Sequence, residues 1–453
     1  MTPSTIVLFI LGLGLLILGA EWLVRGASRL AIGIGISPLV VGLTVVAFGT
    51  SSPEFAVSLK AAMSGQANLA LGNVVGSNIF NVLFILGIAA IIAPLVVSRQ
   101  LVRLDVPIMI AASVAVMWMA GDGMIGRGEG IVLFAALVGY VTFLIVDSIR
   151  AGKAPAEAGA LAPPASRGAK GVAIDVGLIV VGLALLVIGS RWLVTGAVQF
   201  AQALGISEMI VGLTIVAAGT SLPEVAASVI ASIKGERDIA VGNVVGSNLF
   251  NILGVLGAAA FAAPTGIAVD PSALAFDIPV MVAVALCCLP IFFSGAVISR
   301  MEGAVLLCYY VAYTSYLILL AMGHPWLFKA DVVILEFILP LTAIALLLPL
   351  FEEIRAEEIL LKKIPPEDEE ALAAIWRHTR RLIVGVVGTT VVLFGLVLIL
   401  TPGPGVLAIG GGLAILGTEF LWARRLMRKV KRTALAGLRR YRDLKDQATG
   451  APK

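Results

Sequence analysis

The sequence predicts an all-α polytopic membrane protein, with a ten-helix core of two inverted five-helix repeats and about three further C-terminal membrane helices. Three observations predict this class. Of the 453 residues, 59% are hydrophobic and 13% are charged, whereas a soluble domain carries about 25% charged residues. Apolar runs of bilayer-spanning length recur along the chain, and one set of runs repeats another. This composition excludes a soluble enzyme and a disordered scaffold.

Ten apolar runs form the predicted core. A bilayer crossing needs about 20 apolar residues, and short polar breaks separate runs of about this length. The runs lie at 5–24, 38–62, 69–94, 105–120, 130–147, 174–199, 208–232, 239–263, 275–297 and 303–321. We interpret the first run as a true span and not as a signal peptide, because no basic segment precedes it.

The longest break between these runs is rich in Ala, Gly and Pro, a composition typical of linkers. It divides the ten runs into five plus five. We therefore expect a first five-helix repeat at 1–148, a cytoplasmic linker at 149–173, a second, inverted repeat at 174–325 and a C-terminal extension at 326–453.

The two halves repeat residue by residue. A shift of 170 positions aligns Gly35–Asn81 with Gly205–Asn251 without a gap, and 28 of the 47 positions are identical. Shared membrane composition does not reproduce whole motifs at one fixed offset. Because each repeat has an odd number of spans, the second copy enters the membrane from the opposite side. Inverted repeats of this kind are common in secondary transporters.

Basic residues indicate the orientation. With the N-terminus outside, eleven Lys and Arg residues fall on the cytoplasmic side and four fall outside, as the positive-inside rule requires, and the C-terminus is then cytoplasmic. The eleven are Arg25, Arg29, Arg99, Arg103, Arg150, Lys153, Arg167, Lys170, Lys234, Arg237 and Arg300; the four are Lys60, Arg127, Arg191 and Lys329. Because these charges are scattered over the ends of spans, we expect the lipid bilayer as a partner and no nucleic acid.

Two carboxylates occupy matching positions in the middle of apolar runs, Glu54 and Glu224. A carboxylate at membrane depth costs a few kcal/mol, so each must be protonated, paired with a cation or exposed to a water-filled path. Neither has a Lys or Arg nearby in the sequence. The alternative is a structural role, in which each glutamate caps an adjacent half-helix.

Each glutamate follows the motif Gly-Thr-Ser-x-Pro, at Gly49–Pro53 and Gly219–Pro223. Proline removes one backbone donor and glycine permits a bend, so we expect a broken helix that frees carbonyls near Phe48 or Gly49 and near Ala217 to Gly219. Carbonyl, hydroxyl and carboxylate oxygens within one turn are ligands for hard cations such as Ca²⁺ or Na⁺. The alternative is a bend that serves packing alone.

A second motif, Gly-Asn-Val-Val-Gly-Ser-Asn-x-Phe-Asn, occupies 72–81 and recurs at 242–251. Its Ser and last Asn are spaced i, i+4 and therefore lie on one helical face. They add neutral oxygens opposite the glutamates. The middle Asn, Asn78 or Asn248, points elsewhere and is suited to join helices by hydrogen bonds.

These paired motifs resemble the two signature repeats of the cation/calcium antiporter superfamily, and the nearest branch is the prokaryotic sodium/calcium exchangers. The resemblance covers about residues 1–325. It implies a location in a prokaryotic inner membrane, with the second, third, seventh and eighth spans around the ions, and Ca²⁺ and Na⁺ as transported substrates without a cofactor. The implied ligands are Glu54, Glu224, Thr50, Ser51, Thr220, Ser221, Ser77, Ser247, the carbonyls of Ala47 and Ala217, and, in flanking positions, Asn81 and Asn251.

The chain departs from parts of this superfamily at the second motif. Some members, including the potassium-dependent branch, carry an acidic residue at one of the two positions held here by Asn81 and Asn251. The proton-coupled branch usually shows Gly-Asn-x-x-Glu, where this chain reads Gly-Asn-Val-Val-Gly. We therefore expect exchange of Ca²⁺ for Na⁺, with Ca²⁺/H⁺ antiport and K⁺-dependent Na⁺/Ca²⁺ exchange as alternatives.

Charge arithmetic is consistent with exchange. Two carboxylates in one low-dielectric pocket cannot both stay ionised without cations or protons. One Ca²⁺ neutralises them, and so do two Na⁺. A cation channel would use similar oxygens, but an inverted repeat with two broken helices suits alternating access better. An intramembrane enzyme is not expected, because the intramembrane Ser and Glu residues lack a histidine partner.

The C-terminal extension contains apolar runs at about 332–351, 382–400 and 405–422, an acidic segment at 352–381 and a basic tail. The acidic segment lacks EF-hand spacing, and we interpret it as a solvated connector. The basic tail is suited to anionic lipids or to topology anchoring. The hairpin at Pro402–Gly405 resembles small bacterial membrane proteins with a Pro-Gly-Pro-Gly motif, which implies no role here.

Overall fold

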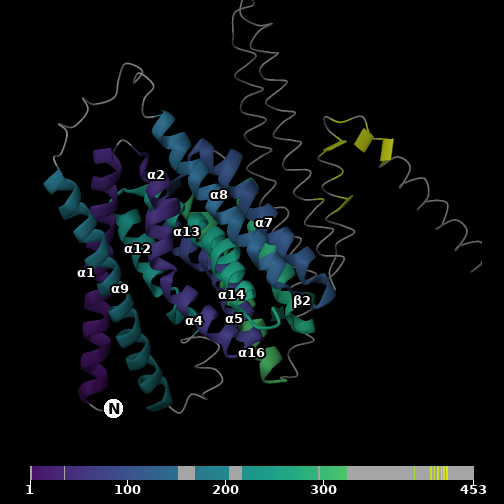
Figure 1. The fold of residues 1–453 in the computed structure, drawn as a ribbon, viewed down its shortest axis with the longest axis horizontal. Coiled ribbons are helices and arrows are strands. Elements are labelled where there is room, and N and C mark those ends of the chain that lie inside the picture. Colours follow the sequence, from purple (N-terminus) through teal and green to yellow (C-terminus); the bar gives the residue numbers. More distant parts are fainter. Residues whose placement is uncertain are drawn as a thin grey trace, which may run out of the picture. The chain divides into compact units, whose positions relative to one another are not determined.

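The computed structural model describes residues 3–34, 36–151, 169–203, 217–293 and 296–323, and isolated positions between 392 and 426. The chain divides into two compact units, residues 1–330 and 331–453. The described part of the first unit is a bundle of helices (Figure 1). Apart from those isolated positions, the spans expected in the C-terminal extension lie outside the described residues, as does most of the linker expected at 149–173.

The first repeat begins with one long helix and continues through a series of interrupted helices. Its α-helices are α1 (Pro3–Ile34), α2 (Pro38–Val41), α3 (Ala47–Thr50), α4 (Ser52–Met63), α5 (Ala67–Phe80), α6 (Gly87–Ile92), α7 (Val106–Met119) and α8 (Arg127–Ala151). A π-helical turn at Gly42–Val46 joins α2 to α3, another at Asn81–Leu86 joins α5 to α6, and a third at Leu101–Asp105 precedes α7. Such turns occur frequently at functional sites.

The second repeat has the same order of elements. Its described α-helices are α9 (Ala169–Ala203), α11 (Ala217–Gly219), α12 (Leu222–Ile233), α13 (Arg237–Leu249), α14 (Gly257–Ala262), α15 (Ile278–Phe293) and α16 (Arg300–Ala321). Its π-helical turns at Phe250–Leu256 and Ala273–Asp277 match two of those in the first repeat. The duplicated sequence therefore produces duplicated irregularities as well as duplicated helices.

The described helices confirm a polytopic membrane protein. Eight of them are long and apolar enough to cross a membrane, and the bent pair Pro38–Thr50 and Ser52–Met63 gives a ninth. The helix Leu222–Ile233 is shorter and is the counterpart of Ser52–Met63. The core of the bundle lies at the second motifs, since the most apolar window of Arg237–Ala262 is 89% buried and that of Arg300–Ala321 is 6% buried.

The two repeats run in opposite directions. From the N-terminus of α1 toward its C-terminus, successive glycines lie against earlier and earlier residues of α9: Gly12 against Gly189, Gly19 against Gly182 and Gly26 against Asp175. These two equivalent helices are therefore antiparallel. The short strands show the same inversion. Strand β1 (Leu95–Val96) pairs antiparallel with β4 (Val297–Ile298), and β2 (Met124–Ile125) pairs antiparallel with β3 (Ile267–Ala268). Each pair takes one strand from each repeat.

Helices α1 and α9 lie side by side and are packed backbone against backbone (Figure 1). Glycines repeat every seven residues on α1, and the same pattern recurs on α9 at Gly182, Gly189 and Gly196. A Cβ added to Gly19 would lie 2.7 Å from the carbonyl oxygen of Gly182. A Cβ added to Gly189 would lie 2.8 Å from the carbonyl oxygen of Gly12. Small residues permit this close approach of membrane helices.

The first helix is longer than the apolar run at 5–24 predicts. It continues through Arg25 and Arg29 to Ile34. Gly26 still lies against α9, where an added Cβ would be 2.8 Å from the carbonyl oxygen of Asp175. The interhelical packing therefore continues beyond the last purely apolar turn, and long basic side chains can extend from a helix toward water.

We predict that Gly19→Ala destabilises the folded protein by about 1–3 kcal/mol, the usual cost of inserting a methyl group into close-packed structure. The clash is with backbone atoms, which cannot change rotamer. Gly14→Ala is the matched control, because a Cβ there meets nothing within 4 Å. Thermal unfolding in detergent measures both variants. Equal melting temperatures for Gly19→Ala and Gly14→Ala would contradict the packing.

Candidate functional site

A bend between α3 and α4 places Glu54 inside the bundle. The helix axis turns by 49° between Pro38–Thr50 and Ser52–Met63, just before Pro53, which cannot donate a backbone hydrogen bond. Glu54 lies in the first turn of α4 and is completely buried. At this end of a helix the backbone dipole is positive, which favours a carboxylate.

The second repeat builds the same bend. Ser221 has φ −86° and ψ 7°, and Ser51 has φ −81° and ψ 8°. Glu224 lies in the first turn of α12 and is 1% exposed. The repeated Gly-Thr-Ser-x-Pro-Glu motif therefore specifies a backbone geometry as well as a set of side chains.

The two glutamates are linked by hydrogen bonds that cross between the repeats. Ser51 Oγ donates to Glu224 Oε1 at 2.8 Å, and Ser221 Oγ donates to Glu54 Oε1 at 2.8 Å. All four side chains are buried. Each carboxylate is therefore positioned by a serine from the opposite repeat, and the site forms only when both repeats come together.

Several buried oxygen atoms of the two pairs of motifs have no hydrogen-bond partner within the described part of the chain. A buried polar group normally has one, because leaving it unpaired costs about 1–3 kcal/mol. The unpartnered side-chain oxygens are Glu54 Oε2, Glu224 Oε2, Asn78 Oδ1, Asn81 Oδ1, Asn251 Oδ1 and Ser247 Oγ. An ionised carboxylate and the oxygen of a side-chain amide can accept hydrogen bonds or bind cations, but neither can donate a hydrogen bond. This group of oxygens therefore suits hard cations.

The two threonines of the first motifs hold the amides of the second motifs across the repeat interface. Thr50 Oγ1 donates to Asn243 Oδ1 at 3.1 Å, and Thr220 Oγ1 donates to Asn73 Oδ1 at 3.5 Å. The Thr50 hydroxyl also lies 3.4 Å from the carbonyl oxygen of Ala47. The carbonyl oxygen of Ala47 accepts a backbone hydrogen bond from Ser51 N at 3.0 Å. Ala47 therefore lies at the bend and keeps its helical hydrogen bond. Ala217 occupies the start of α11.

Asn73 and Asn243 are site residues that sequence reasoning missed. Asn73 Nδ2 donates to Ser58 Oγ at 2.8 Å and to the carbonyl oxygen of Glu54 at 3.3 Å. Asn243 repeats this with Ser228 Oγ at 2.9 Å and the Glu224 carbonyl at 3.4 Å. Their recurrence inside the duplicated motif is the signal that could have identified them.

The remaining residues of the second motifs meet where the repeats cross. Asn251 Nδ2 donates to Ser77 Oγ at 3.1 Å, and Asn81 Nδ2 donates to Asn248 Oδ1 at 3.0 Å. Both bonds join one repeat to the other. Ser77, Asn81 and Asn251 thus take part in bonds between the repeats. Ser247 Oγ is buried and has no partner among the described residues.

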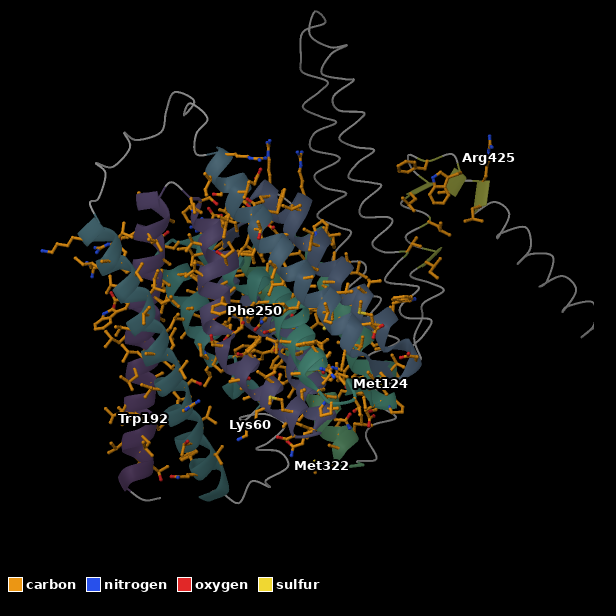
Figure 2. The ribbon with its side chains drawn as sticks, in the orientation of Figure 1. Lys60, Met124, Trp192, Phe250, Met322 and Arg425 are labelled. Carbon is orange, nitrogen blue, oxygen red and sulfur yellow. The ribbon has the colours of Figure 1, made fainter. Side chains whose placement is uncertain are left out.

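Aromatic rings pack beside the site. Phe250, which lies near the middle of the bundle in Figure 2, has its ring centroid 5.1 Å from that of Phe48 and 6.3 Å from that of Phe55. Phe48 and Phe55 flank the bend of the first repeat, and Phe250 precedes Asn251. These rings supply apolar contact between the repeats next to the polar network.

Within the described ranges, no group of three or more His, Cys, Asp or Glu side chains is placed to hold a metal ion. The charged groups of the site are thus the two glutamates, surrounded by hydroxyl, amide and carbonyl oxygens. Such a set fits a hard cation and lacks the thiolate and imidazole ligands that zinc and copper prefer.

Sequence comparison assigns the family. The profile described as "Sodium/calcium exchanger protein" matches residues 4–146 and 174–319, which include both copies of each motif. The chain belongs to the sodium/calcium exchanger family. It is therefore a membrane transporter of the exchanger type and not an enzyme. A second profile, that of a transmembrane protein family designated PGPGW, matches residues 381–433.

Two individual relatives each match more than half of this chain. Inner membrane protein YrbG of Escherichia coli (strain K12) is 39% identical over 244 residues, which are 53% of this chain and 74% of YrbG. Sodium/calcium exchanger MaX1 of Methanosarcina acetivorans is 32% identical in an alignment of 301 positions that covers 59% of this chain and 85% of MaX1.

A solved exchanger structure has the same fold. The sodium-calcium exchanger NCX_Mj matches with a TM-score of 0.59 and 29% sequence identity, over 71% of this chain and 99% of the other. The part of the chain that matches corresponds in length to the ten-helix core expected from the sequence. The predicted helical core of two repeats is thus confirmed, with the short strand pairs β1–β4 and β2–β3 in addition.

We predict that Asn243→Ala lowers the stability of the folded protein by about 1–3 kcal/mol, because it leaves the hydroxyls of Thr50 and Ser228 without their amide partner. Asn68→Ala is the control, since Asn68 lies on an exposed face of α5 and should change stability by less than about 0.5 kcal/mol. Thermal unfolding of detergent-solubilised protein measures both. A loss for Asn243→Ala no greater than for Asn68→Ala would show that the amide does not support the bend.

Proposed function

We propose that this exchanger-type antiporter moves Ca²⁺ in exchange for Na⁺ across the membrane by alternating access. The observation that carries the proposal is the group of buried oxygens without hydrogen-bond partners, which includes one oxygen of each glutamate. Buried oxygens of this kind require protons or cations as partners. The choice of cations is supported by two similar proteins, MaX1 and NCX_Mj, each of which is named as an exchanger of sodium and calcium.

The proposed ligands combine two charged and several neutral groups. Glu54 and Glu224 are the charged ligands, and each keeps one oxygen free while a serine of the other repeat holds its second oxygen. The neutral ligands that we propose are Thr50, Ser51, Thr220, Ser221, Ser77, Ser247, Asn81, Asn251 and the carbonyls of Ala47 and Ala217. Oxygen donors in this mixture are those that Ca²⁺ takes in proteins.

Electroneutrality explains why Ca²⁺ and Na⁺ would exchange. Two carboxylates in a low-dielectric site repel each other unless cations or protons neutralise them. One Ca²⁺ supplies two positive charges, as do two Na⁺, and the neutral oxygens tolerate a third Na⁺. An empty site with two unneutralised charges would be costly to enclose. We infer that the carrier changes its access state when loaded, which is the condition for coupled exchange.

The orientation and organisation follow from the same proposal. We place the N-terminus outside and the C-terminus in the cytoplasm of a prokaryotic cell, in its inner membrane, on the basis of the eleven-to-four distribution of basic residues. The transporting part comprises the repeats at 1–148 and 174–325, joined by a cytoplasmic linker at 149–173. The extension at 326–453 is an addition to that part.

We predict that Glu54→Gln and Glu224→Gln each reduce Na⁺-driven Ca²⁺ uptake to the level of protein-free vesicles, because one negative charge cannot neutralise Ca²⁺ in a buried site. The measurement is ⁴⁵Ca²⁺ uptake into proteoliposomes loaded with Na⁺. Glu129→Gln is the control, since Glu129 lies in the first turn of α8 as Glu54 does in α4, outside the proposed site. Persistence of uptake in both site variants would refute the ligand assignment.

We predict that an outward Na⁺ gradient alone drives Ca²⁺ uptake by the wild-type protein. Potassium and pH gradients, imposed one at a time, should leave uptake within about twofold of the rate without a gradient. The amides at Asn81 and Asn251 are the sequence basis, because they replace the acid that the resemblance associates with potassium dependence. Uptake driven by a pH gradient without Na⁺ would assign Ca²⁺/H⁺ exchange, and a requirement for K⁺ would assign the potassium-dependent type.

A further inference from the structure

Most hydrogen bonds of the site occur in equivalent pairs, one in each repeat. The bond from Ser51 to Glu224 has its equivalent in the bond from Ser221 to Glu54, with the same length of 2.8 Å. The bonds from Asn73 and Asn243 to their serines differ by 0.1 Å, at 2.8 and 2.9 Å. The serine–glutamate and asparagine–serine bonds thus obey the pseudo-two-fold symmetry.

The last asparagines of the second motifs do not obey it. Asn81 Nδ2 donates to Asn248 Oδ1 at 3.0 Å. The equivalent bond would run from Asn251 to Asn78 Oδ1. Instead, Asn251 Nδ2 donates to Ser77 Oγ at 3.1 Å. Two residues with the same sequence context therefore use different kinds of partner.

The acceptors left unused are the equivalents of those in use. Asn78 Oδ1 corresponds to Asn248 Oδ1, and Ser247 Oγ corresponds to Ser77 Oγ, by the offset of 170. Both Asn78 Oδ1 and Ser247 Oγ are buried and have no partner within the described residues. The structure therefore contains a second, complete set of acceptors for the same two donors.

The amides of Asn78 and Asn248 also differ. Asn248 Nδ2 lies 3.4 Å from the carbonyl oxygen of Asn78, across the repeat interface. Asn78 Nδ2 donates at 2.7 Å to the carbonyl oxygen of Val74, within its own helix. Asn248 thus contacts the other repeat through both the oxygen and the nitrogen of its side-chain amide. Among the described contacts, the side-chain amide of Asn78 bonds only within its own helix.

Exposure breaks the symmetry in the same region. Thr50 and Asn243 are completely buried, but their equivalents Thr220 and Asn73 are partly exposed. The described state is therefore more open at the Thr220–Asn73 half of the site. In a protein of two inverted copies, exchanging the conformations of the copies yields the state open to the other side.

We propose that Asn78 and Asn248 are positioning residues that alternately hold the proposed ligands Asn251 and Asn81, one in each access state. In the described state Asn248 holds Asn81 and Ser77 holds Asn251. In the opposite state Asn78 holds Asn251 and Ser247 holds Asn81. This inference rests on the proposed function, because it takes the amides as cation ligands and alternating access as the transport cycle.

The exchange of partners leaves both ligand oxygens available. Asn81 Oδ1 and Asn251 Oδ1 are unpartnered in the described state, since each residue uses its Nδ2 group to bond its holder. The opposite state uses the same Nδ2 groups as donors. A cation at the site therefore keeps its amide oxygens while the hydrogen bonds between the repeats change, so the change of access does not require the cation to lose these ligands.

The test uses Asn248→Ala and Asn78→Ala, because the two variants remove the holder of opposite states. A reporter cysteine, Thr220→Cys or Thr50→Cys, is introduced after Cys287, Cys288 and Cys308 are replaced by Ala, and labelling by a soluble maleimide is timed. Asn248→Ala should slow labelling at Thr220→Cys by about fivefold and accelerate it at Thr50→Cys. Asn78→Ala should have the opposite effects.

The double variant and a control separate this role from plain destabilisation. Asn78→Ala with Asn248→Ala should return labelling close to that of the parent protein, since both states lose their holder. Ser113→Ala is the control, because the Ser113 hydroxyl donates within its helix to the carbonyl oxygen of Met109 at 2.8 Å, next to Asn248, whose Nδ2 lies 3.6 Å from Met109 Sδ. It should leave both labelling rates unchanged.

Changes of the same sign in Asn78→Ala and Asn248→Ala, or no change in either, would overturn the inference. Labelling does not require transport, so the result stands apart from the proposed function. Absence of Na⁺-driven Ca²⁺ uptake in the parent protein would refute that function. Opposite labelling shifts together with such an absence would keep the alternating holders and reassign the transported ion.

Discussion

The burial of two carboxylates between inverted repeats is the constraint on which the rest of the structure depends. A charge at membrane depth is expensive, and here each glutamate gains a serine donor from the opposite repeat and a position in the first turn of a half-helix. Neither repeat can complete the arrangement alone. The bends and the bonds between the repeats place two acidic groups in one buried arrangement. Under the proposed function, one cation load neutralises both.

The hydrogen bonds that hold the carboxylates are equivalent in the two repeats, whereas those of the last asparagines of the second motifs, Asn81 and Asn251, are not. The serine–glutamate bonds are equal in both repeats, since a change in either would leave a carboxylate without its donor. The neutral amides are cheaper to repartner, because a hydrogen bond between neutral groups contributes about 1 kcal/mol net. Under the proposed function, carboxylates with fixed donors and amides that change partners allow one site both to bind ions and to change its access.

Much of this could be predicted from the sequence, because membrane spans and duplicated motifs leave strong local signals. The apolar runs located the helices, and the fixed offset of 170 placed Glu54 and Glu224 in equivalent positions. Asn73 and Asn243 were missed because their role depends on contacts to Ser58 and Ser228 on a neighbouring helix. The length of α1 beyond residue 24 was missed for a similar reason, since its glycines acquire meaning only against α9.

The glycine contacts between α1 and α9 also have a consequence for the biogenesis of the protein. The two helices touch through backbone atoms, so no lipid chain can lie between them at Gly12, Gly19 and Gly26. Yet equivalent positions on the partners are 170 residues apart, which corresponds to about 10–30 s of synthesis at typical ribosomal rates. Helix α1 is therefore in the bilayer before α9 is synthesised, and during this interval its glycine face has no partner helix. We therefore expect the two long helices to dock after both have been inserted, and insertion machinery that shields α1 during this interval should raise the yield of folded protein.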